Sequence, residues 1–230
     1  FTRRELRVPD PLIDVRLFAH PRVGASLITT LLLGAALFGT LVILPLYFQI
    51  LRGEDAFTTG LLLVPSALGA AAIMPATGPL TARFGTGAVV AVGVTVLALA
   101  TLSFTQLGPH TPYWLICVLL AIRGFGLGAC FMPAMTAGYE ALHRSAVARA
   151  TSAMNVVQRV GGSFGTALLT VILHAQLAGA DGIAPTADAL HNTFAWAFAL
   201  AIAALPPALL LAVDDRRYPI ASRFGSSRGR

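Results

Sequence analysis

Two arginines lie inside long apolar stretches, where a charge is least expected. Arg123 follows the apolar run YWLICVLLAI and Arg159 follows NVVQ in a later run, whereas the other fourteen of the sixteen arginines lie between or beyond such runs. An apolar segment holds a guanidinium only where other protein groups or a water-filled cavity receive it. Each of the two therefore indicates either a site for a polar ligand or a side chain that locks helices together through backbone carbonyls.

A serine in a glycine pattern offers a second kind of chemistry. Gly161, Ser163 and Gly165 form G-x-S-x-G, the pattern of the nucleophile elbow in hydrolases. A serine nucleophile needs an adjacent base, yet no histidine lies deep in an apolar run. We therefore expect no enzyme, and interpret Gly161 and Gly165 as a G-x-x-x-G face for close helix packing.

A third pattern, G-x-G-x-x-A, begins at Gly124 in RGFGLGACFMP. A dinucleotide-binding fingerprint must follow a strand and open a helix, whereas this one lies within a long apolar run. Gly124 and Gly128 instead make a second G-x-x-x-G packing face. We expect neither a cofactor nor a metal ion.

The composition indicates a bilayer protein. The apolar set makes up 56% of the 230 residues, with 22 glycines in addition, against roughly 45–50% in soluble domains with glycine included. Uninterrupted apolar runs of about 20 residues predict membrane helices rather than barrel strands. The fold class is therefore all-α, one bundle of six predicted spans: Val23 to Tyr47, Thr58 to Thr81, Gly87 to Leu107, Tyr113 to Gly138, Thr151 to Leu173 and Thr193 to Val213.

The loop arginines predict the orientation of the chain. Thirteen lie on the side that carries both ends, whereas the opposite loops hold Arg52 alone, near Glu54 and Asp55. By the positive-inside rule both ends are cytoplasmic. We expect residues 1–22 to be a cytoplasmic linker, 23–213 the six-helix bundle and 214–230 a basic cytoplasmic tail. The arginines follow the bilayer, so no nucleic-acid partner is expected.

Polar side chains concentrate in the fourth and fifth spans, which carry Arg123, Asn155, Gln158 and Arg159. This asymmetry predicts that these two spans face a cavity or a partner, while the third and sixth face lipid. No aspartate or glutamate lies within a predicted span. An acidic partner, if one is needed, must come from outside this chain.

The strings SAMNVVQRVGGSFGTALL, RGFGLGACFMPAMTAGY, PLIDVRLF and GLLLVPSALGAAAIMPATGPLTARFG together resemble the C-terminal half of a major facilitator superfamily drug:proton antiporter, of the fourteen-helix EmrB/QacA type. The resemblance covers essentially the whole chain, and implies two six-helix bundles that rock about a midplane site, with the first, second, fourth and fifth spans here lining the cavity. It implies a missing N-terminal half that carries the proton. The family's cytoplasmic signature is incomplete, because Ala82 stands at its aspartate position.

We therefore expect a proton-coupled exporter of apolar or cationic drug-like or antibiotic molecules in the plasma membrane, without a signal peptide and as the tail of a longer protein. A narrow-specificity metabolite exporter, a non-transporting scaffold and an intramembrane enzyme remain alternatives. The expected partners are the small-molecule substrate, protons, the lipid bilayer and the N-terminal half. The candidate cavity or coupling residues are Arg123, Phe131, Met135, Asn155, Gln158 and Arg159.

Overall fold

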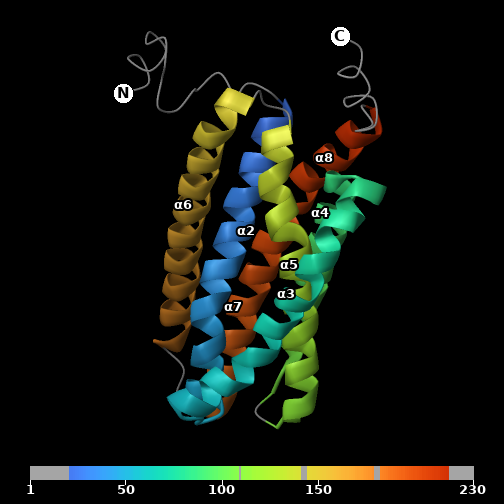
Figure 1. The fold of residues 1–230 in the computed structure, drawn as a ribbon. Helices are drawn as coiled ribbons and strands as arrows, with labels where there is room; N and C mark the ends of the chain where they lie inside the picture. Colours follow the sequence, from blue (N-terminus) through green and yellow to red (C-terminus); the bar gives the residue numbers. More distant parts are fainter. Residues whose placement is uncertain (1–20, 109, 141–143, 179–181, 218–230) are drawn as a thin grey trace, which may run out of the picture.

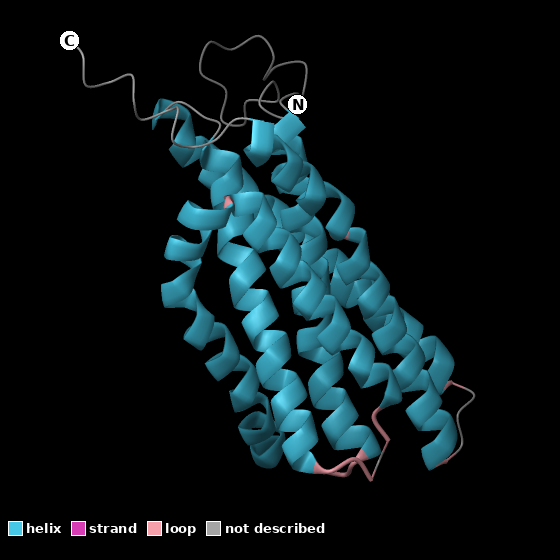
Figure 2. Ribbon diagram, turned by 90° about the vertical axis from the view of Figure 1, so that its right-hand side faces the viewer, coloured by secondary structure: helices cyan, strands magenta, loops and turns pink. Residues whose placement is uncertain are grey.

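The computed structural model describes residues 21–108, 110–140, 144–178 and 182–217. Within them the chain is helical apart from short connections (Figure 2). The elements are α2 (Pro21–Leu46), the π-helix η2 (Tyr47–Leu51), α3 (Ala56–Phe84), α4 (Thr86–Ser103), the 3-10 helix η3 (Phe104–Gln106), α5 (Tyr113–Glu140), α6 (Arg144–Leu177), α7 (Ile183–Ala203) and α8 (Leu205–Arg217).

These elements make six apolar segments long enough to cross a bilayer, which confirms the predicted all-α, six-helix architecture. α2 begins and α8 ends at the same end of the bundle, at the top of Figure 1. The sixth segment is assembled from α7 and α8, which meet at Ala204. An even number of crossings returns the chain to the side from which it started.

The sixth helical segment begins before the predicted span start at Thr193, because α7 begins at Ile183. The first turns of this helix are more polar than a membrane span, but Ala187 and Leu190 are buried against the bundle. His191 also anchors the helix, since its Nε2 donates a hydrogen bond to the Leu107 carbonyl at 2.7 Å. A buried apolar face and this bond hold a helix where hydropathy alone indicates a loop.

α2 packs along α6 through glycines that allow the backbones to meet. A Cβ on Gly161 would overlap the Leu31 carbonyl, and one on Gly165 would overlap the Ala35 backbone. The contact is reciprocal, since a Cβ on Gly34 would lie 2.5 Å from the carbonyl oxygen of Gln158. We call this contact the α2–α6 seam. Its small residues bring the helices close enough for dispersion contacts between backbones.

α3 packs along α5 in the same way, and we call this contact the α3–α5 seam. A Cβ on Gly124 would overlap the Ser66 carbonyl, and one on Gly128 would lie 2.7 Å from the carbonyl oxygen of Ala70. The first span, α2, is therefore joined to the fifth, α6, and the second span, α3, is joined to the fourth, α5. Together the two seams fix how α5 and α6, which carry the intramembrane arginines, sit against α3 and α2.

The apolar core fills the space between the seams. In its upper part Val90, Val94 and Leu97 of α4 pack with Leu33 of α2 and with Cys130 of α5. α4 is thus one of the better-buried segments, although it also exposes apolar side chains such as Val92 and Leu99 on another face. The expectation that the third span faces lipid stays a prediction.

An aromatic cluster closes the core at the lower end. Pro45 lies inside α2 and has no backbone N–H for the helical ladder, and a π-helical turn follows directly. This turn buries Tyr47 and Phe48, whose rings meet edge to face with centroids 5.2 Å apart. Phe104 and Phe194 complete the cluster with ring centroids 5.5 Å apart.

Candidate functional site

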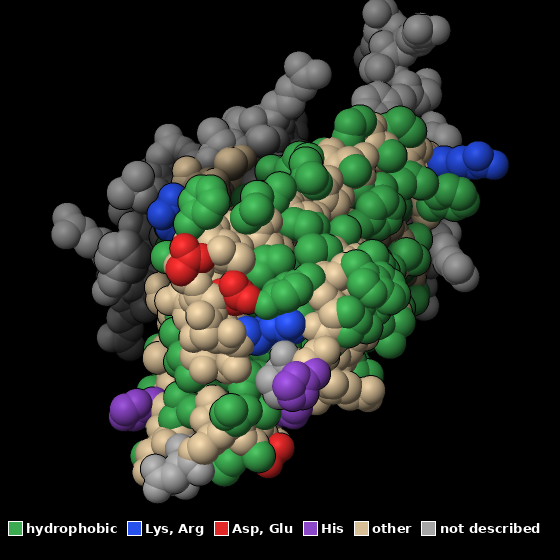
Figure 3. Space-filling view, turned by 90° about the horizontal axis from the view of Figure 1, so that it is seen from below, with side chains coloured by type: hydrophobic (Ala, Val, Ile, Leu, Met, Phe, Trp, Pro, Cys, Tyr) green, Lys and Arg blue, Asp and Glu red, His purple; other side chains and the backbone are tan. Residues whose placement is uncertain are grey.

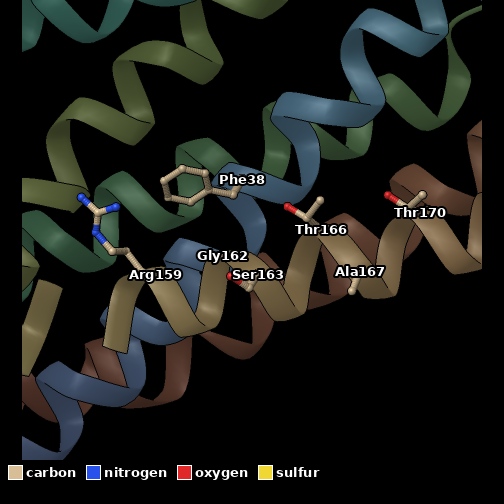
Figure 4. Close-up of a pocket in the computed structure, with 7 residues that line it drawn as sticks. All are labelled: Phe38, Arg159, Gly162, Ser163, Thr166, Ala167 and Thr170. Carbon is tan, nitrogen blue, oxygen red and sulfur yellow. The ribbon is translucent and has the colours of Figure 1, made fainter. Parts of the chain in front are cut away.

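An open groove of about 740 Å³ runs along α6 beside α2 (Figure 4). Its lining comes from α6 and from Phe38 of α2, and a Cβ on Gly162 would lie 2.6 Å from the Phe38 ring. The lining combines one cation, three hydroxyls and an aromatic ring: Phe38, Arg159, Gly162, Ser163, Thr166, Ala167 and Thr170. We call it the Arg159 groove.

The polar groups of the Arg159 groove follow from helical geometry. Arg159, Ser163, Thr166 and Thr170 are spaced four, three and four residues apart, which places them on one face of a helix. In Figure 4 the Arg159 side chain and the two threonines rise on the same side of α6 as the Phe38 ring. The groove can therefore offer a ligand one positive charge, several hydroxyls and an aromatic face.

Arg123 occupies a different place, a cavity of about 300 Å³ between α2, α3 and α5. The residue is only 4% exposed, and its Nε is buried without a hydrogen-bond partner. The residues that line this Arg123 cavity are mostly aliphatic: Leu37, Leu41, Leu44, Leu63, Ser66, Ala67, Ala70, Arg123 and Leu127.

The other four candidate residues lie apart from the pockets of the two arginines. Asn155 is exposed on α6, and its Nδ2 donates to the Thr151 carbonyl at 2.9 Å. Gln158 is half-buried, with its backbone carbonyl at the α2–α6 seam. Met135 is buried in an apolar cluster against which Phe131 packs. None of the four lines the Arg159 groove or the Arg123 cavity.

Sequence reasoning missed Ala167 and three side chains of the Arg159 groove that can contact a ligand, namely Phe38, Thr166 and Thr170. The threonines could have been found, because they continue the three-to-four spacing that starts at Arg159. Phe38 could not, since its place depends on how α2 crosses α6.

The lower end of the bundle carries a polar cluster that joins two loops. Figure 3 views this end and shows acidic and histidine side chains among apolar ones, with arginine between them. Arg52 Nη1 donates to the Thr111 carbonyl at 2.8 Å, and its guanidinium lies 4.1 Å from the centroid of the Tyr113 ring. The Tyr113 hydroxyl in turn donates to Glu54 Oε1. The loop after the first span is thereby tied to the loop before the fourth.

Two ionisable groups of these loops have shifted pKa values. Burial lowers the pKa of Arg52, but the neighbouring Tyr47 and Tyr113 side chains outweigh it and leave the pKa above its ordinary value. The pKa of Asp55 is below its ordinary value because the carboxylate accepts hydrogen bonds from Thr58, first from its side chain and then from its backbone N–H. The backbone bond, 3.0 Å long, makes Asp55 the N-cap of α3.

Comparison with known proteins assigns this helical architecture to a family. Residues 2–166 match the family model described as Major Facilitator Superfamily.

Curated relatives extend the match to the rest of the chain. The puromycin resistance protein pur8 of Streptomyces alboniger is 31% identical over 99% of this chain and 47% of its own length. The MFS-type transporter YcnB of Bacillus subtilis is 35% identical over 91% of the chain and 44% of its own length. A multidrug resistance protein B homolog of Mycobacterium tuberculosis is 35% identical over 73% of the chain and 31% of its own length. The chain thus spans 31% to 47% of the length of these relatives.

Proposed function

This chain belongs to the Major Facilitator Superfamily, a family of membrane transporters, and from that premise we propose that it is the C-terminal half of a proton-coupled exporter of drug-like or antibiotic molecules, of the fourteen-helix EmrB/QacA type. The family and the six apolar helices make it a multi-pass membrane protein. Family membership also indicates a transporter rather than an enzyme, so Ser163 belongs to a groove lining and not to a nucleophile elbow.

The Arg159 groove is the observation that carries the proposal. A groove of about 740 Å³ falls within the size range of small-molecule sites, roughly 300–1,000 Å³. It combines an aromatic ring, hydroxyls and a guanidinium on a face of α6 that this chain leaves open. Such a face can both contact a substrate and change its exposure when a second bundle moves over it.

The need for a second bundle is supported by the exposed helix faces. α3 exposes Leu61, Val64 and Leu68, and α6 exposes Val160 and Phe164. An apolar face that also carries polar groups is suited to a protein partner better than to lipid alone. The chain spans at most 47% of the length of the three relatives, which leaves room for an N-terminal bundle in a complete transporter.

The names of the relatives support the substrate class. One is named for multidrug resistance and another for puromycin resistance. We propose proton coupling, with the proton-carrying carboxylate in the N-terminal half. The one acidic residue within the six described segments is Asp188, and it lies in the first turns of α7, near the end of its segment. We further propose that the protein lies in the plasma membrane with both termini in the cytoplasm.

Transport in membrane vesicles tests the proposal. We expect inside-out vesicles that contain the complete transporter to accumulate puromycin or a fluorescent drug-like dye when the lumen is acidified. A protonophore should abolish the accumulation, and the 230-residue chain alone should show none. Accumulation that persists with the protonophore would contradict proton coupling. No accumulation of any compound, with the protein verified in the membrane, would contradict the exporter itself.

A further inference from the structure

We propose that the Arg123 cavity binds the carboxylate of an amphipathic substrate, an inference that deepens the proposed function and rests on it. The site lies between α2, α3 and α5, apart from the Arg159 groove on α6. Arg123 is the one charged group that lines the cavity, so its chemistry determines the substrate class that we infer.

The first step concerns the unpaired charge. Arg123 is only 4% exposed, its Nε has no partner, and no described residue accepts a hydrogen bond from its guanidinium. A buried cation without a partner is strongly unfavourable. The alternative in which Arg123 locks helices through backbone carbonyls requires such bonds, and the described part of the chain provides none.

The second step concerns the geometry of the acceptor. A guanidinium presents its donors in a planar fork that matches the two oxygens of a carboxylate. Ser66 is the other polar side chain in the lining, so its hydroxyl is available to the same anionic group. The lining offers no acidic side chain for a cationic ligand. Binding of a cationic drug, one of the substrates expected from the sequence, is therefore not favoured at this site, because its amine would meet the like charge of Arg123.

The third step concerns the rest of the ligand. Leu37, Leu41 and Leu44 of α2, Leu63 of α3 and Leu127 of α5 form the apolar wall around Arg123. At about 300 Å³ the cavity is at the lower end of small-molecule sites. It fits a compact apolar body with one carboxylate.

Binding to the purified complete transporter, without a proton gradient, tests the assignment. The probes are 4-phenylbutyrate, its methyl ester and 4-phenylbutylamine, which share one apolar body and differ in charge. We expect the carboxylate to bind roughly tenfold or more tightly than the ester, as a charge-assisted hydrogen bond implies. Arg123→Gln should remove this preference. Arg83→Gln, which removes an exposed arginine at the far end of α3, should keep it.

Three outcomes would overturn the assignment. Equal binding of the carboxylate and the ester to the unaltered protein would show that no anion site exists. An equal loss of all three probes in Arg123→Gln would assign Arg123 to the structure, or to a carboxylate of the rest of the transporter. If Arg123→Gln does not accumulate, Arg123→Lys replaces it, and a preference as strong as that of the unaltered protein would rule out recognition by the fork. Failure of vesicle transport with the binding preference intact would remove the exporter proposal alone.

Discussion

The α3–α5 seam predicts that one added methyl group at Gly128 destabilises the protein. A Cβ there would lie 2.7 Å from the Ala70 carbonyl oxygen and 2.7 Å from Cγ2 of Ile73, whereas ordinary contact begins at 3.4 Å. The difference, 3.4 minus 2.7, means that α3 must move away by about 0.7 Å. The carbonyl belongs to a helix backbone, so no side-chain rotation relieves the contact.

The size of the effect comes from a matched pair. Gly60 lies in the same helix as Ala70, and a Cβ there meets nothing within 4 Å. Both Gly→Ala changes gain the same helix propensity, up to about 1 kcal/mol, so the gain cancels between them. What remains is overpacking at Gly128, about 1–3 kcal/mol. If α3 moves away by this distance, each dispersion contact along the seam loses about a quarter to a half of its attractive energy.

Thermal denaturation of the detergent-purified protein measures the difference. We expect Gly128→Ala to melt below Gly60→Ala by roughly 2–4 °C for each kcal/mol, with Gly60→Ala at or above the unaltered protein. Equal melting temperatures for the two variants would refute the reasoning, because they would show that the seam has room for a methyl group.

Three further predictions concern the groove, the topology and the first loop. Arg159→Ala should abolish export with a near-normal protein level and Arg159→Lys should restore part of it, because lysine keeps the charge without the fork; normal efflux in the alanine variant would remove Arg159 from transport. A reporter active only outside the cell should work in the loop at Gly182 and be silent after the C-terminal residue; the opposite pattern would reverse the orientation. Because the pKa of Asp55 is lowered on folding, its contribution to stability is complete above the unfolded value near pH 4 and is lost as pH falls through the folded value. The melting temperature of Asp55→Asn should therefore depend less on pH below about pH 4 than that of the unaltered protein. An unchanged dependence of the melting temperature on pH would contradict the N-cap assignment.

Hydropathy was sufficient to predict the six membrane segments, since each one carries apolar side chains along most of its length. It did not predict that the helix of the sixth segment begins as early as Ile183. The reason is that a hydropathy window averages over all faces of a helix. Ala187 and Leu190 are buried while Asp188 between them is exposed, so the average hides a helix that packing stabilises.

The candidate site shows the same limit. Spacing along the chain was enough to select Arg123 and Arg159 as intramembrane charges. It could not distinguish their surroundings, because Arg123 is enclosed by leucines of α2, α3 and α5 and Arg159 lies in an open groove. Enclosure depends on where distant helices cross. Only contacts between segments, such as Gly124 against Ser66, determine those crossings.

The two seams also set an order for assembly during synthesis. Ser66 and Gly124 are separated by 58 positions, but Leu31 and Gly161 by 130. At translation rates of about 5–20 residues per second, roughly 3–12 s separate the partners of the α3–α5 seam and roughly 7–26 s those of the α2–α6 seam. α2 therefore waits in the bilayer while α3, α4 and α5 are made, and the nascent chain closes its inner helix pair before its outer one.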